Sequence, residues 1–215
     1  MDHSRSLSIL ALCFAVGCGR EIVAPANRAT SAESPSLGLV STSSTPHFLR
    51  PAAGAPRIAN PLVKFYAKKG VDREAFMYYH RSTTGKDSVV FLRMRVRARS
   101  LDRRPNGSRI AFGDSVLITI RLVDPTRLIV DCQPAGLKFS VDHPADLKLS
   151  YAETDRDVNH DGRVDNRDRQ LTTKFKVWRR ETSTSPWGPL PSTVTFGTHE
   201  VESDIFGFTR YAIAF

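Results

Sequence analysis

The feature that most constrains the fold of this chain is a hydrophobic period of two that recurs in short segments. In residues 91–98, FLRMRVRA, apolar side chains alternate with three arginines, so the two kinds face opposite sides of an extended chain. Strand-like patterns of this kind mark five further segments, at 115–123, 126–132, 147–151, 174–178 and 209–215. Turn residues separate the segments, and no window carries a sustained helical period. The sequence therefore predicts an all-β fold, an antiparallel β-sandwich built by residues 61–215.

The chain begins in the manner of a secreted protein. Residues 1–18 combine Arg5 with the apolar stretch LSILALCFAVG, which is too short to span a bilayer and is typical of a signal peptide. The run AVGC at 15–18 resembles a bacterial lipobox, which implies that Cys18 becomes the lipid-carrying N-terminus of the mature protein. Gly19 after it implies sorting to the outer membrane of a bacterium with two membranes. Ordinary cleavage and release is the alternative interpretation.

Between this signal and the predicted domain, residues 19–60 are rich in Ala, Ser, Thr and Pro and show no apolar period. Such a composition predicts a flexible linker that holds the domain away from a membrane. The mature chain would then keep Cys132 as its only other cysteine, which excludes an internal disulfide. The apolar run LIVDC around Cys132 favours a buried structural thiol over a nucleophile.

Residues 157–168, DVNHDGRVDNRD, have the spacing of a calcium-binding loop. The side chains at ligand positions 1, 3, 5, 9 and 12 would be those of Asp157, Asn159, Asp161, Asp165 and Asp168. Gly162 stands at position 6, where a sharp reversal lets the carbonyl of Arg163 turn inward as the ligand at position 7. Val164 follows as the expected apolar anchor. The pattern predicts one Ca²⁺ ion held by six residues.

Two details predict weak binding by this loop. Its last ligand is Asp168, which is shorter than the usual Glu, and Arg156 and Arg169 flank the loop with positive charge. We therefore expect a dissociation constant of about 10⁻⁴ M, as in extracellular modules. The alternative interpretation is an acidic Asn/Asp/Gly turn that is merely solvated.

Residues 157–168, within the wider loop region 155–170, resemble the calcium loops of dockerins and related EF-hand proteins, which often carry Asp at the last ligand position. A dockerin has two such loops, whereas this chain has one, and the approach LKLSYAETDR is not an apolar helix. The resemblance therefore implies a calcium staple inserted into another fold. The segment NRDRQL after Val164 could form one helical turn.

A second resemblance covers residues 110–215. The segments QPAGLKF (133–139), LKLSY, WGPLPSTV (187–194), HEV (199–201) and FGFTRYAIA (206–214) look like a bacterial version of the ZU-type β-sandwich. Animal relatives of that domain occur in netrin receptors, ankyrins and zonula-occludens scaffolds. The resemblance implies a module for interaction or autoinhibition, without a transferable active site.

The net charge of +9 and the pI of about 9.8 suggest a second possible binding surface. Arg93, Arg95, Arg97 and Arg99 would form a ladder on one strand face, able to engage phosphates or carboxylates. Possible partners are an anionic glycan, lipopolysaccharide or a protein. The absence of aromatic side chains between the arginines disfavours nucleic acid as a partner. The alternative is a solvated strand face.

An enzyme is the least favoured interpretation. The histidines His80, His143, His160 and His199 sit at no metal-ligand spacing, and no hydrolase motif is present in the sequence. Glu153 and Asp155 could pair as acid and base, but their position beside the calcium loop explains them better. The sequence thus predicts a non-enzymatic, lipid-anchored β-sandwich of the cell envelope that acts as a structural or interaction module.

Overall fold

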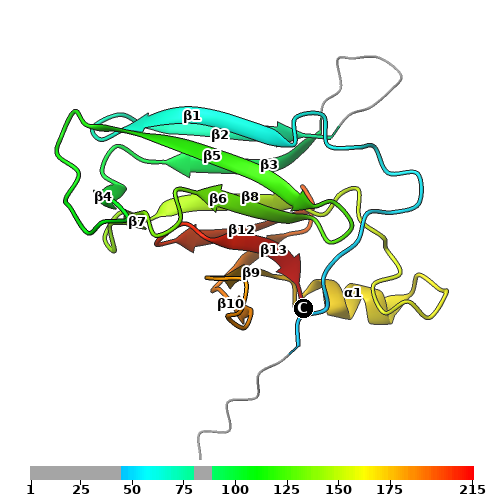
Figure 1. Ribbon diagram of the computed structural model, residues 1–215. Coiled ribbons are helices and arrows are strands. Elements are labelled where there is room, and N and C mark those ends of the chain that lie inside the picture. The colour runs from blue at the N-terminus through cyan, green and yellow to red at the C-terminus, as the bar shows by residue number, and fades with distance from the viewer. Residues whose placement is uncertain (1–44, 80–88) are drawn as a thin grey trace, which may run out of the picture. The chain divides into compact units, whose positions relative to one another are not determined.

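The computed structural model describes residues 45–79 and 89–215, which form two antiparallel sheets packed on a shared core (Figure 1). The larger sheet has six strands in the order β1-β5-β6-β13-β9-β10, and the second has five in the order β11-β12-β8-β3-β2. A small two-stranded sheet pairs β4 with β7. The predicted all-β antiparallel sandwich is confirmed.

The strands of the six-stranded sheet are β1 (Leu62–Lys68), β5 (Ser115–Asp124), β6 (Ile129–Gln133), β13 (Arg210–Ala214), β9 (Lys176–Arg180) and β10 (Gly188–Pro189). Those of the five-stranded sheet are β11 (Thr193–Thr195), β12 (Glu200–Ile205), β8 (Ala145–Ser150), β3 (Val90–Val96) and β2 (Arg73–Tyr78). The small sheet consists of β4 (Leu101–Arg103) and β7 (Lys138–Phe139). A short helix, α1 (Asn166–Thr172), precedes β9. Within the described ranges, no helix has the length and apolar character needed to cross a membrane.

The core lies where the alternating patterns place it. Leu92, Met94 and Val96 of β3 are buried, whereas Arg93 and Arg95 lie on the opposite face of the same strand. The buried side chains join those of β5 in one apolar cluster, which includes Val116, Ile118 and Ile120. Each fully buried aliphatic side chain contributes about 1.5–3 kcal/mol relative to exposure, so this cluster is the main source of cohesion between the sheets.

The folded body begins earlier than residue 61, the boundary that composition predicts. Leu49 is 4% exposed, and its N–H donates to the carbonyl of Ile213 at 3.2 Å. The N–H of Ala52 donates to Glu153, and the N–H of Asp155 donates to the carbonyl of Arg50. The segment 47–55 therefore straps the C-terminal strand to the start of the 155–170 loop (Figure 1). Its Pro and Ala residues suggested a linker because the segment has no apolar period. Backbone hydrogen bonds hold it against the domain instead.

The signal peptide at 1–18, Cys18 and the linker up to residue 44 lie outside the described residues, and so does His80. Their predicted roles stay predictions.

Candidate metal centre

The candidate calcium loop lies between β8 and β9, and its last three residues are the first three of α1. Val158 is 8% exposed and joins the apolar core, so it anchors the loop. Val164, the expected anchor, is 65% exposed. The expectation for Val164 was wrong: the apolar residue that anchors the loop to the core is at position 2, not at position 8.

The first three predicted ligands lie together and share hydrogen bonds. One carboxylate oxygen of Asp157 accepts the N–H of Asp161 at 3.1 Å, and the other accepts the N–H of Gly162 at 2.7 Å. The side-chain oxygen of Asn159 accepts the N–H of Asp161 at 2.9 Å, and its amide nitrogen donates to the Asp161 carboxylate at 3.0 Å. The chain therefore curls around the Asp157 side chain.

The sharp reversal expected at position 6 is present. Gly162 has a φ of +85°, in the left-handed region that a side chain disfavours, and an added Cβ there would meet open space. The residue is thus required for its backbone conformation and not for close packing. The N–H of Arg163 then donates to Asp161 at 3.0 Å, which closes the first half of the loop.

The last two predicted ligands have a role that the spacing did not reveal. Asp165 is the N-cap of α1, and its carboxylate accepts the N–H of Arg167 at 2.7 Å. Asp168 reaches back to accept the N–H of Asp165 at 2.8 Å. The two residues form a capping box, which satisfies N–H groups that the first turn of a helix leaves unpaired.

Asp168 also ties the helix to the start of the loop. Its other carboxylate oxygen accepts the N–H groups of Val158 at 2.8 Å and Asn159 at 3.2 Å. The residue is 3% exposed. The hydrogen bond from the Asp165 N–H, with those from Asn159 and Val158, lowers the pKa of Asp168 and keeps it ionised despite burial. Three backbone donors therefore take the place of a cation at this carboxylate.

Hydrogen-bonding capacity decides which oxygens could also bind an ion. Each carboxylate oxygen of Asp157 and Asp161 accepts one donor, which leaves one lone pair on each. One oxygen of Asp168 accepts two donors and the other accepts one, so this residue could supply a single bond rather than the expected bidentate pair. The donor set fits a weak oxygen-ligand site.

The side chains do not already form a metal centre. Across residues 45–79 and 89–215, no group of three or more His, Cys, Asp or Glu side chains is placed to hold a metal ion. Asp165 and Asp168 are directed to backbone donors, and Arg163 has only its carbonyl to offer. Calcium binding stays a prediction, and it would require some of these side chains to turn.

The second predicted site, the arginine ladder, lies on the outer face of the five-stranded sheet. We call the outward side chains of β2, β3, β8 and β12, with Asp72 and Arg97 beside them, the ionic face. Arg95 donates to Asp72 at 2.8 Å, and this hydrogen bond lowers the pKa of Asp72. Arg97 donates to Asp146 at 2.7 Å, and Arg93 lies 3.9 Å from Glu202. Three of the four arginines thus have carboxylate partners within the fold, which disfavours the ladder as a free anion site.

One pair on the ionic face has like charges. Asp146 and Asp204 stand directly opposite each other on β8 and β12. Burial raises the pKa of Asp146; Arg97 opposes this rise, and a hydrogen bond with Asp204 adds to it. Asp146 is 5% exposed, so the rise reflects a carboxyl group that loses solvation beside a second carboxyl group.

Three other candidate residues from the sequence, Cys132, His160 and His199, pack within the fold or contact neighbouring side chains. Cys132 is fully buried and unpaired, as predicted for a structural thiol. Nδ1 of His160 lies 3.9 Å from Asp155, whose carboxylate accepts the N–H of Asp157 at 3.1 Å. His199 packs edge-on against Tyr151.

Comparison of the chain with protein-family models, curated proteins and solved structures finds no match.

Proposed function

We propose that this chain is a calcium-binding β-sandwich of the bacterial cell envelope, lipid-anchored through Cys18, and that it acts as a structural or interaction module. The supporting observation is the set of contacts that the loop carboxylates make. Asp157, Asp161 and Asp168 have no cationic partner among the described residues, and each keeps an oxygen lone pair beyond its backbone hydrogen bonds. Oxygen donors of this kind are what Ca²⁺ prefers.

The ion would act as a staple between distant parts of the fold. The loop begins where the strap at 47–55 bonds to Glu153 and Asp155, and it ends in α1, which leads into β9. Asp157 and Asp161 belong to the first half of the loop, and Asp168 belongs to the helix. An ion shared by these residues would fasten the strap, β8 and β9 to one another, at the cost of turning their side chains.

Calcium-dependent thermal stability tests the proposal. For a dissociation constant of about 10⁻⁴ M, 10 mM Ca²⁺ stabilises the folded state by about 2.7 kcal/mol. We expect the melting temperature of the full chain to rise by about 5–10 °C between chelator and calcium. Asp157→Asn should abolish this rise, and it should lower the melting temperature in chelator only modestly, because the amide oxygen can still accept one of the two solvent-exposed backbone N–H groups. Asp142→Asn, which removes an exposed carboxylate outside the loop, is the matched control.

Identical melting curves in chelator and in calcium would refute the calcium proposal. A rise of equal size with Mg²⁺ would indicate general screening of the acidic loop rather than a site for the larger ion.

The lipid anchor has a separate test. Expression of the full chain in a bacterium supplied with labelled palmitate should label the protein, and Cys18→Ser should remove the label. A labelled Cys18→Ser variant would contradict the assignment of that cysteine, without consequence for the calcium loop.

A further inference from the structure

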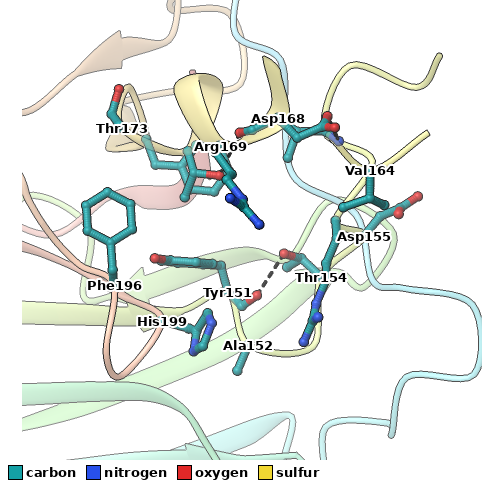
Figure 2. A pocket seen from close by; sticks show the side chains of 14 residues that line it. Tyr151, Ala152, Thr154, Asp155, Val164, Asp168, Arg169, Thr173, Phe196 and His199 are labelled. Carbon is teal, nitrogen blue, oxygen red and sulfur yellow. Dashed lines mark hydrogen bonds between the residues drawn. The ribbon is translucent and has the colours of Figure 1, made fainter. Parts of the chain in front are cut away.

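A pocket of about 580 Å³ lies beside α1 and is lined in part by residues of the 157–168 loop (Figure 2). It is bounded by the end of β8, by the loop and α1, and by the turn between β11 and β12. Its volume falls in the range that encloses small organic ligands, roughly 300–1,000 Å³.

Aromatic side chains form one side of this pocket. Tyr151 is buried, and its ring packs edge-on against Phe175, with 5.3 Å between ring centroids, and against His199 at 5.4 Å. Phe196 lines the same side and is 54% exposed (Figure 2). A large exposed apolar side chain beside a buried aromatic cluster offers a stacking surface to a flat or aliphatic ligand.

Cationic side chains complete the lining. Figure 2 shows Arg169 of α1 directed across the hollow from the helix, and Arg156 also lines it. Neither guanidinium group has a hydrogen-bond or ion-pair partner among the residues that the structure describes. Two carboxylates, Asp155 and Asp168, share the lining, but Asp168 is bonded to backbone donors and Asp155 accepts the N–H of Asp157. The unpaired donors of the pocket are therefore positive.

We propose that this pocket binds a small amphipathic anion. Its apolar or aromatic body would lie against Phe196 and Tyr151, and its carboxylate or sulfonate would accept hydrogen bonds from Arg169. A guanidinium group recognises such anions with paired donors, and the apolar wall removes water from the contact. The pocket shares Val158, Val164 and Asp168 with the candidate calcium loop, but neither Arg169 nor Phe196 is a predicted calcium ligand, so probe binding can be measured in chelator, apart from any effect of the ion.

The test uses two fluorescent probes with the same aromatic body. Anilinonaphthalene sulfonate carries one negative charge, and N-phenyl-1-naphthylamine carries none. We expect saturable binding of the sulfonate to the full chain, and an increase of about tenfold in its dissociation constant in Arg169→Gln. The neutral probe should bind Arg169→Gln as it binds the unchanged chain. Phe196→Ala should weaken binding of both probes.

Matched variants control for charge and for exposed aromatic surface. Arg167→Gln removes the same charge from α1 outside the pocket, and Phe112→Ala removes an aromatic ring that is 71% exposed elsewhere. Neither should change binding of either probe. Equal affinities of Arg169→Gln and Arg167→Gln for the sulfonate would overturn the proposal, as would the absence of saturable binding.

Discussion

The ionic face and the 157–168 loop both gather charged side chains, but they satisfy them in different ways. On the ionic face, strand pairing brings residues from distant parts of the chain into contact, as between Arg97 and Asp146. In the loop, the acidic side chains turn to backbone N–H groups within the same short segment, as Asp168 does. The face is largely neutralised by its own carboxylates, whereas the loop keeps its negative charge.

This difference explains why the arginine ladder is disfavoured as a free anion site, whereas calcium binding by the loop stays a prediction. A row of arginines read along β3 looks basic because the partners lie on β2, β8 and β12 and are not adjacent in sequence. The acidic residues of a loop are neighbours in both sequence and space, so no hidden cation cancels them. Local charge patterns are therefore better evidence for a site in a loop than on a sheet.

The largest expected effect separates the capping role of Asp168 from a role in calcium binding. Asp168→Ala should lower the melting temperature by about 5 °C or more in chelator, because three backbone donors lose their acceptor and α1 loses its capping box. Asp157→Asn should change mainly the rise in melting temperature that calcium causes. Thermal melts of both variants, with and without calcium, measure the two contributions.

The acid sensitivity of the protein provides a second readout for Asp168. The pKa of this group is lowered by folding, so its contribution is present above the unfolded pKa of about 4 and is lost as the pH falls through the folded value. In Asp168→Ala, the free energy of unfolding should therefore fall less steeply as the pH is lowered below about 4. An unchanged slope in that pH range would show that the backbone contacts of Asp168 do not stabilise the native state.

Much of the fold could be predicted from the sequence because an alternating pattern reports which face of a strand is buried. Of the six predicted segments, 91–98 and 115–123 correspond closely to β3 and β5. By contrast, β1 and β2 were not predicted, since apolar or aromatic side chains also occupy their outer faces and blur the alternation, as do Tyr66 in β1 and Phe76 in β2. The strap at 47–55 was missed because hydrogen bonds to Ile213 and Glu153 hold it, and composition does not encode such partners.

The candidate site was predictable only in part. Spacing identified the turn at Gly162 and the grouping of Asp157, Asn159 and Asp161. Calcium-loop spacing did not reveal that Asp165 and Asp168 cap a helix, because in a capping box the residue three positions after the N-cap is usually Glu or Gln rather than Asp. The pocket was not predicted because it forms where the turn that carries Phe196 and His199 lies against residues 151–175, which only the fold brings together.

A smaller effect concerns the like-charged pair on the ionic face. Asp204→Asn should stabilise the protein by about 0.5 kcal/mol at pH 7, because it removes a carboxylate directly opposite Asp146. Folding raises the pKa of Asp146, so its contribution is fully present below about pH 4 and is lost as the pH rises through the folded value. The gain in Asp204→Asn should therefore disappear at low pH in denaturant titrations.

Glu202→Gln is the matched control for that prediction. Glu202 lies on the same strand and face but is 3.2 Å from the ammonium group of Lys148, so its removal breaks an attractive contact. It should be neutral or slightly destabilising. Equal gains from both substitutions would mean that total negative charge, rather than the opposition of Asp146 and Asp204, limits stability.

The smallest effect is expected for the arginines themselves. Arg93→Gln with Arg95→Gln should change the melting temperature by less than about 2 °C, because partly exposed ion pairs contribute little. Lys64→Gln with Lys68→Gln removes the same charge from the outer face of β1, where neither lysine has an ion-pair partner among the described residues. If the ionic face is internally neutralised, the lysine pair should reduce retention on a heparin column more than the arginine pair does. A larger loss for the arginine pair would show that this face does engage polyanions, and that the carboxylates beside it can be displaced.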